Sequence, residues 1–241
     1  MKIPQPAPAL TPDLVLYGYT IGVFPMADSE NGIIRWYFPL KRAIIPLENY
    51  HAPRSLRQVI KKSTFEIRVN TNFEAVMRAC ASERGDGYGT WISDEMIEVY
   101  TELHKAGYAH SIESYYNGEL AGGLYGISIG AAFFGESMFY RVPNASKVAF
   151  DFLISRLKER QYELLDSQYI NDNVKRFGAI EISKEEYTDK LKLALRRQLY
   201  FDQTPINPIL NDSDWDREEN EAIIVPNTRI ILNNDWEEEG D

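Results

Sequence analysis

The sequence has little of what several common functional classes need. Its single cysteine, Cys80, excludes an internal disulfide framework and is typical of a reducing compartment. No apolar run approaches the roughly 18 residues of a membrane span, and the N-terminus MKIPQPAPAL lacks the apolar core of a signal peptide. We therefore expect a cytoplasmic protein. Its 241 residues allow one large domain, or one domain with a smaller companion.

Motifs for common cofactors are also absent. There is no Gly-Lys-Ser/Thr phosphate loop, and Gly122, Gly123 and Gly126 are spaced wrongly for a dinucleotide motif. The three histidines are not at ligand spacing, and one cysteine cannot build a structural zinc site. His104 and His110 are interpreted as structural rather than catalytic. We predict no metal and no other cofactor.

Charge is distributed unevenly along the chain. The net charge of −10 resides in residues 202–241, so the remaining residues carry 24 acids and 24 bases. Within that neutral part, residues 35–68 have a net charge of +6. Such a segment suits phosphate contact, although a solvated basic face without a ligand would explain it equally. The acidic tail is interpreted as a solubilising extension, with packing of its IIVP and IILN runs on the body as the alternative.

Apolar periodicity and capping signals predict alternating helices and strands. Thr11, Ser93 and Ser183 are expected helix caps, and Asn117-Gly118 predicts a two-residue hairpin. Residues 22–42 are interpreted as a loop, and Cys80 as a buried core residue rather than a nucleophile. We expect helices at 11–22, 53–62, 73–80, 93–107, 144–160, 171–178 and 183–197, and strands at 64–70, 108–116, 119–130, 131–139, 162–168 and 179–182. This order predicts an α+β fold with a mostly antiparallel central sheet.

Three short polar groups interrupt this apolar framework. They are Gly135-Glu136-Ser137, then Asn144 to Lys147, then Asp166 to Asn171. A carboxylate in an apolar strand must face solvent or meet a cation, because burying it alone is costly. A capped helix and a polar turn would explain these groups without any chemistry.

The order of these polar groups along the chain resembles that of a known protein family. From about Leu14 to Leu191 the chain resembles the leucyl/phenylalanyl-tRNA–protein transferases of bacteria. The blocks that carry this resemblance are YTIGVFP, CASERGDGYGTWI, the run from TWISDEM to AAFFGESMF, NASK, and LLDSQYINDNVKRFGAIEISKEEY. The resemblance implies a small N-terminal domain at 1–63, a GNAT-like acyltransferase domain at 64–200 and an acidic extension at 201–241. It also implies aminoacyl-tRNA, rather than acetyl-CoA, as the acyl donor.

The implied reaction moves leucine or phenylalanine, or methionine, from tRNA to the α-amine of proteins that begin with Arg or Lys. This transfer marks them for degradation under the N-end rule. By resemblance, Asp166 and Gln168 form the catalytic pair, with Asp166 orienting or polarising Gln168 and the Gln168 carbonyl accepting a proton from the amine. Asn171 holds the acceptor backbone, and Glu136 contacts its positive charge. A monomer is expected.

The resemblance also assigns the donor side of the site. The apolar pocket for the donor side chain would be lined by Leu124, Phe133, Phe134, Phe150, Leu157 and Leu165, for which ordinary core is the alternative. The terminal adenosine would lie among Tyr19, Trp91 and Tyr100, since aromatic stacking on a base is worth about 1–3 kcal/mol. The tRNA phosphates would contact Arg54, Arg57, Lys61 and Lys62.

Two positions depart from the family pattern. Met26 stands where the family usually has Trp, and residues 36–42 replace its WWSPDPR segment. Both bear on the donor entrance, so the alternatives are a family member with another donor or acceptor preference, or a non-catalytic tRNA- or N-terminus-binding module. Retention of Glu136, Asp166, Gln168 and Asn171 argues against the non-catalytic module.

Overall fold

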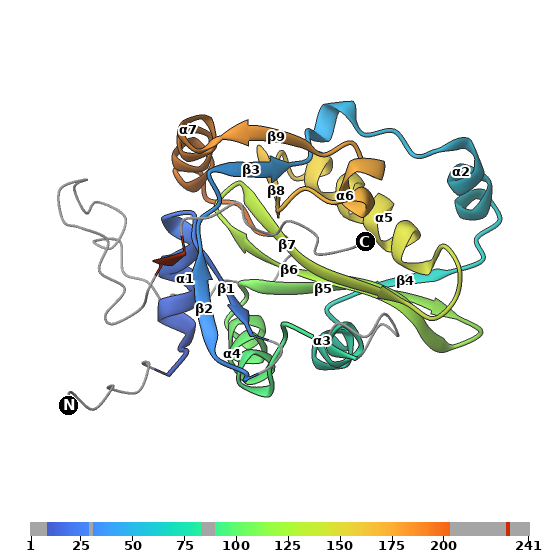
Figure 1. Ribbon diagram of the computed structural model, residues 1–241. Coiled ribbons are helices and arrows are strands. Elements are labelled where there is room, and N and C mark those ends of the chain that lie inside the picture. The colour runs from blue at the N-terminus through green and yellow to red at the C-terminus, as the bar shows by residue number, and fades with distance from the viewer. Residues whose placement is uncertain (1–8, 29–30, 83–89, 203–229, 232–241) are drawn as a thin grey trace, which may run out of the picture.

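A computed structural model describes residues 9–28, 31–82, 90–202 and 230–231 (Figure 1). The helices are α1 (Pro12–Thr20), a 3₁₀ helix η1 (Leu47–Asn49), α2 (Arg54–Lys61), α3 (Phe73–Ala81), α4 (Asp94–Lys105), α5 (Ala145–Glu159), α6 (Asp172–Arg176) and α7 (Lys184–Leu195). The strands are β1 (Phe24–Ala27), β2 (Ile34–Tyr37), β3 (Lys41–Ile44), β4 (Glu66–Val69), β5 (Ala109–Tyr116), β6 (Glu119–Ile129), β7 (Ala132–Tyr140), β8 (Leu164–Gln168), β9 (Ile180–Ser183) and β10 (Ile230–Ile231).

The capping residues act as the sequence predicts. The hydroxyls of Thr11, Ser93 and Ser183 accept hydrogen bonds from backbone N–H groups in the first turns of α1, α4 and α7. The β5–β6 turn has positive φ at both Asn117 and Gly118, as a tight hairpin requires. Cys80 is buried in the core, in agreement with its structural interpretation.

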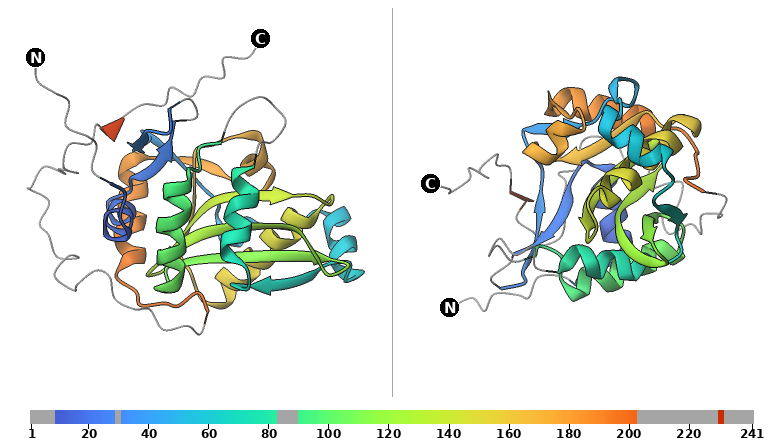
Figure 2. Two further views of the ribbon diagram at one scale, coloured as in Figure 1. Left: turned by 90° about the horizontal axis from the view of Figure 1, so that it is seen from below. Right: turned by 90° about the vertical axis from the view of Figure 1, so that its right-hand side faces the viewer.

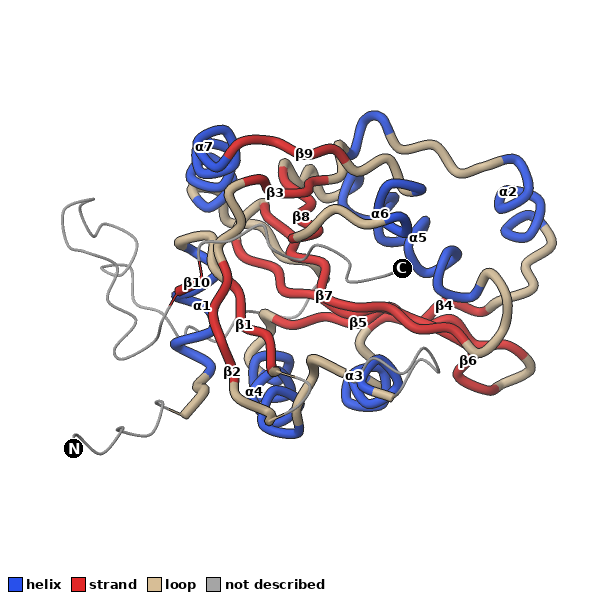
Figure 3. The backbone as a smooth tube through the Cα atoms, viewed as in Figure 1, coloured by secondary structure: helices blue, strands red, loops and turns tan. Residues whose placement is uncertain are grey.

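The central sheet has the strand order β4-β5-β6-β7-β8-β3-β9. Every neighbouring pair is antiparallel except β7 and β8, which are parallel and joined through α5. The prediction of an α+β fold with a mostly antiparallel sheet is confirmed, although the sheet is mixed. Figure 3 shows the strands of this sheet in red, together with the shorter strands beside α1.

Residues 22–42, expected to form a loop, instead contain β1 and β2 and lead into β3. β1 and β2 pair antiparallel, and β10 from the acidic tail pairs parallel with β2. The interpretation as a loop is wrong because the aromatic and branched residues of this stretch pair across a hairpin in spite of its Gly and Pro residues. Pro25 is tolerated because β1 is an edge strand.

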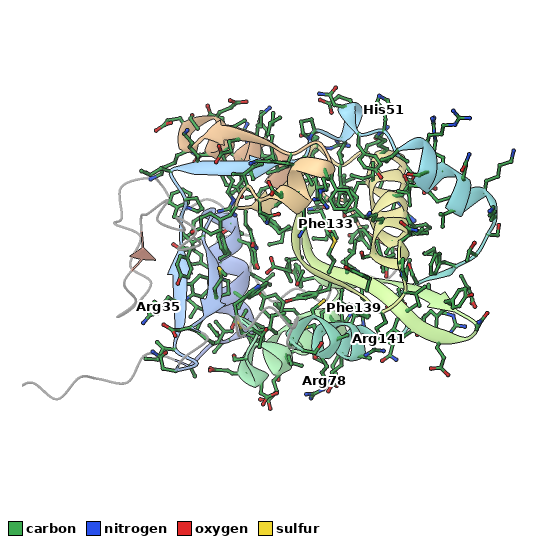
Figure 4. All side chains as sticks on the ribbon, turned by 45° about the vertical axis from the view of Figure 1, so that its right-hand side comes forward. Arg35, His51, Arg78, Phe133, Phe139 and Arg141 are labelled. Atoms are coloured by element: carbon green, nitrogen blue, oxygen red, sulfur yellow. The ribbon has the colours of Figure 1, made fainter. Side chains whose placement is uncertain are left out.

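Two apolar cores lie on opposite faces of the central sheet. Figures 1 and 2 show α3 and α4 against one face of the β5–β7 region and α5 against the other. Phe133, labelled in Figure 4, lies inside the molecule, whereas Arg78 and Arg141 are exposed. β3 lies in this sheet although it precedes residue 63, and the domain boundaries at 63 and 200 stay predictions.

Candidate functional site

A pocket opens where β7 and β8 separate. The two strands pair only as far as Phe134 and Asp166, although β7 continues to Tyr140. The pocket has a volume of about 230 Å³. Its lining comprises Met26, Ile45, Trp91, Leu124, Tyr125, Gly135, Glu136, Ser137, Met138, Phe150, Leu153, Leu165, Asp166, Ser167, Gln168, Tyr169, Asn171, Asn173, Val174 and Phe177. Two of the three polar groups singled out in the sequence therefore meet at one pocket.

Glu136 is the extra residue of a β-bulge. Gly135 and Ser137 of β7 pair with the adjacent residues Gly126 and Tyr125 of β6, which leaves Glu136 without a partner in the ladder. A bulge of this kind redirects a side chain and is frequent beside active sites. Gly126 is required here because a Cβ on it would lie 2.4 Å from the carbonyl oxygen of Phe134.

The carboxylate of Glu136 accepts two hydrogen bonds on the same oxygen. The Tyr19 hydroxyl donates to Oε1 over 2.6 Å, and Gln168 Nε2 donates to Oε1 over 2.9 Å. Burial of the carboxyl group raises the pKa of Glu136 to about 7, although both hydrogen bonds oppose this shift. Glu136 therefore exchanges its proton near neutral pH.

Asp166 is held by a buried ion pair that the sequence analysis missed. Its carboxylate is fully buried and accepts hydrogen bonds from Arg42 Nε at 2.9 Å and Arg42 Nη2 at 2.6 Å. The Tyr187 hydroxyl donates to Oδ2 over 2.7 Å, and the Gln168 backbone N–H donates to Oδ1 over 2.8 Å. Asp166 raises the pKa of Arg42 although burial of the guanidinium opposes this. Both Asp166 oxygens are thus occupied by donors.

Gln168 has a backbone φ of +64°, a conformation that non-glycine residues seldom adopt. The Asp166 carboxylate stabilises this backbone by accepting its N–H. Because an ionised carboxylate only accepts, the side-chain NH₂ of Gln168 must face Glu136, and its carbonyl then points away from that carboxylate. Asp166 therefore contacts Gln168 through its backbone N–H.

Asn171 follows β8 and caps α6. Its side-chain oxygen accepts hydrogen bonds from the backbone N–H groups of Asn173 and Val174, both at 3.0 Å. The residue is exposed and lines the pocket. This cap fixes the Asn171 side chain at the pocket rim, with its NH₂ group as the remaining donor.

Half of the predicted donor-pocket residues line the pocket. Leu124, Phe150 and Leu165 do so, together with Ile45, Leu153 and Phe177, which the sequence analysis did not name. The other three predicted residues, Phe133, Phe134 and Leu157, are fully buried core and do not line the pocket. Phe133 and Phe134 lie where β7 and β8 are still paired, so the strands leave no space beside them.

The three predicted adenosine-binding aromatic residues occupy different positions. Trp91 is half-buried and lines the pocket beside Met26, with its carbonyl held by the backbone N–H of Ala27 at 3.0 Å. Tyr19 and Tyr100 are fully buried behind Glu136, and their hydroxyls are 2.8 Å apart. Neither tyrosine offers an exposed ring face on which a base could stack.

The predicted phosphate contacts lie together on an exposed helix. Arg54, Arg57 and Lys61 are on α2, and Lys62 follows it; all four side chains are exposed. Of the other bases in the segment 35–68, Arg42 is buried against Asp166 and Arg68 pairs with Glu66. The predicted phosphate contacts thus form one basic surface on α2, which packs against α5 (Figure 1).

The described residues contain no group of three His, Cys, Asp or Glu side chains that could hold a metal ion. Among the same residues, no helix is both long and apolar enough to cross a membrane.

Comparison with known proteins identifies the family. Residues 44–192 match the leucyl/phenylalanyl-tRNA protein transferase family, and residues 9–40 match the N-terminal domain of that family. The leucyl/phenylalanyl-tRNA–protein transferase of Prosthecochloris aestuarii is 50% identical over 187 residues, which cover 78% of this chain and 96% of the relative. The protein of the same name from Paramagnetospirillum magneticum is 48% identical over 195 residues, which cover 80% and 93%.

Solved structures resemble the chain more distantly. A ribosomal-protein-alanine N-acetyltransferase from Brucella melitensis is 14% identical, with a TM-score of 0.34, and the match covers 47% of this chain and 88% of that one. L-PGS from Bacillus licheniformis is 13% identical, with a TM-score of 0.40, over 73% of this chain and 60% of that one. These similarities are too low to add to the family match.

Proposed function

The chain belongs to the leucyl/phenylalanyl-tRNA protein transferase family and is an aminoacyltransferase; from this premise we propose that its β7–β8 pocket moves leucine or phenylalanine from tRNA to proteins that begin with Arg or Lys. Methionine, which is unbranched, is a further donor. The single observation that carries this proposal is a pocket with an apolar interior and a rim formed by Glu136 and Gln168, 2.9 Å apart. A cytoplasmic location suits a protein whose substrate is charged tRNA.

The apolar part of the pocket suits the side chain of the donor amino acid. Phe150 and Leu153 of α5 face Leu124 of β6 and Leu165 of β8 across one apolar cluster. Donors that are unbranched or branched at Cγ extend into such a space. Donors branched at Cβ carry their bulk beside the ester rather than in this apolar space. Leucine, phenylalanine and methionine are therefore the expected donors, and valine and isoleucine are not.

The polar rim suits the acceptor protein. Glu136 and Asp166 line the pocket, and no Lys, Arg or His of the described chain lines it with them. Asp166 is already neutralised by Arg42, so the charge available to a ligand is that of Glu136. A positive acceptor N-terminus is attracted to this position. We assign Asn171, which lines the same pocket, to the acceptor backbone.

The attack needs positioning more than a covalent nucleophile, because the donor ester is already activated. The Gln168 carbonyl, turned away from Glu136, would accept a hydrogen bond from the attacking amine. Asp166 would keep that carbonyl in place through the Gln168 backbone. Both residues thus act as a pair, with Asp166 as the positioning member.

We propose that tRNA approaches across α2. This helix presents Arg54, Arg57 and Lys61, with Lys62 at its end, and it packs against α5, whose Phe150 and Leu153 line the pocket. Phosphates would contact α2 while the terminal adenosine stacks on Trp91. Phosphate contacts carry no sequence information, which suits an enzyme that accepts tRNAs of different sequence.

A mixed-substrate assay tests the proposal. The protein is incubated with a pool of aminoacyl-tRNAs and peptides that differ in their first residue, and the products are identified by mass spectrometry. We expect leucine, phenylalanine and methionine on peptides that begin with Arg or Lys. Transfer of valine or isoleucine instead would show a different donor preference, and transfer to none of the peptides would refute the proposal.

A further inference from the structure

The two carboxylate oxygens of Glu136 have different surroundings. Oε1 accepts hydrogen bonds from Tyr19 and Gln168, whereas Oε2 is covered by protein and has no hydrogen-bond partner among the described residues. An unpaired buried acceptor is unfavourable, and more so when it carries charge. Glu136 lines the pocket, and an N–H donor bound there would relieve this cost once it displaced the atoms that cover Oε2.

Other groups of the pocket cannot take a proton as readily. The Asp166 oxygens are occupied by Arg42, Tyr187 and the Gln168 backbone. The amide oxygen of Gln168 accepts hydrogen bonds but is a very weak base. No histidine or lysine lines the pocket in the described part of the chain. Glu136 is the remaining carboxylate.

Two buried tyrosines fix the orientation of Glu136. The Tyr19 hydroxyl has one proton and donates it to Glu136, so the Tyr100 hydroxyl must be the donor in its 2.8 Å contact with Tyr19. The chain Tyr100–Tyr19–Glu136 therefore fixes Oε1 from α1 and α4 and leaves Oε2 as the basic oxygen. Of the charged groups nearby, Asp166 raises the pKa of Glu136 and Arg42 lowers it, and the net value of about 7 suits proton exchange at neutral pH.

We propose that Glu136 removes a proton from the α-ammonium of the acceptor and that Oε2 is the atom that takes it. The inference rests on the proposed function. The α-ammonium gives one proton to Glu136, and the neutral amine nitrogen forms a bond to the ester carbonyl carbon. The bond from that carbon to the ribose oxygen then breaks. A second amine proton passes to the ribose oxygen, the third stays on the new amide, and Glu136 returns its proton to solvent.

The test compares two acceptors in the Glu136→Gln variant. One is a peptide that begins with Arg, and the other carries an aminooxy group in place of the α-amine, whose nitrogen is neutral at pH 7. Single-turnover rates are measured with saturating acceptor and leucyl-tRNA. We expect the rate with the amine to fall about five- to tenfold, because the variant cannot take its proton and only about one tenth of a free α-amine is neutral at pH 7. The rate with the aminooxy peptide should fall less than the rate with the amine, since its nitrogen carries no proton that must be removed before the attack.

Either of two results would overturn the inference. An unchanged rate with the amine would show that Glu136 only binds the acceptor, a role that changes KM but not the rate at saturating acceptor. Equal losses with both acceptors would show that Glu136 only shapes the pocket. Affinity for an aminoacyl-tRNA analogue with an amide link checks that the variant is folded. If the unmodified enzyme transfers leucine to neither peptide, the proposed function fails rather than the role of Glu136.

The Tyr19→Phe variant gives a second reading. It removes a hydrogen bond that lowers the pKa of Glu136. The midpoint of the rise of the single-turnover rate with pH should therefore lie about 0.5–1 pH unit higher than in the unmodified enzyme. Tyr100→Phe is the matched control, one hydroxyl farther away, and should move the profile in the same direction by less. A profile that neither variant moves would contradict the inference.

Discussion

The β7 and β8 sides of the pocket carry carboxylates with opposite surroundings. Asp166, on β8, is enclosed by an arginine, a tyrosine hydroxyl and a backbone N–H. Glu136, on the β7 bulge, has both of its hydrogen bonds on one oxygen. Two buried acids a short distance apart thus have different uses, because the partners of each decide whether it can exchange a proton. Asp166 stabilises a backbone conformation, and Glu136 is available to a ligand.

The largest effect should follow removal of Arg42. Arg42→Met leaves the Asp166 charge buried without its cation, which should lower the free energy of unfolding by about 3–5 kcal/mol. Chemical denaturation measures this loss. Arg42→Met combined with Asp166→Leu should lose less than the sum of the single variants, since the unpaired charge is gone. Additive losses would mean that the pair is not coupled.

Replacing Glu136 should raise the stability of the protein, whereas replacing Arg42 lowers it, and the size of the gain should depend on pH. The folded pKa of Glu136, about 7, lies above its unfolded value, so the folded state favours the protonated acid. The stability that this gives is present at low pH and is lost as pH rises toward 7 and above. The Glu136→Gln variant does not lose this stability. Its free energy of unfolding should therefore exceed that of the unmodified protein by an amount that grows to about 2 kcal/mol between pH 4.5 and 8. A difference that does not vary with pH would show that the pKa of Glu136 is the same in both states.

Gln168 connects the two carboxylates, and its side chain should matter chiefly for the reaction. Gln168→Ala should lower single-turnover rates at least tenfold, about 1.4 kcal/mol in the barrier, because it removes the group that holds the attacking amine. Affinity for tRNA should change little. Asp166→Asn is the useful comparison, since it weakens the Gln168 backbone contact and should lower both rate and stability. An unchanged rate in Gln168→Ala would remove this side chain from the mechanism.

The smallest effect on the reaction is expected from changes at α2, which contacts neither carboxylate. Replacing Lys61 and Lys62 together by alanine should weaken all tRNAs to a similar degree and reduce the dependence of log affinity on log salt by about 2. Rates at saturating tRNA should be unchanged. An unaltered salt dependence would mean that tRNA does not contact α2.

Local structure was largely predictable from the sequence, and the exceptions have a physical cause. Helix caps and the Asn117-Gly118 turn depend on neighbouring residues, so they can be recognised in the sequence. β3 was missed because what stabilises it is pairing with β8 and β9, which come far later in the chain. β1 and β2 pair with each other, but the Gly and Pro residues around them obscured their strand signal.

The candidate site divides in the same way. The sequence by itself determined the family and the fold class. It also predicted Glu136, Asp166, Gln168 and Asn171 as site residues, because their types and order are visible along the chain. Only the tertiary structure decided which partner each acid has. Arg42 looked like one base of a surface segment, yet it lies 124 residues before Asp166 and is buried against it. Burial and hydrogen bonds between distant segments set protonation, and these arise only when the chain is folded.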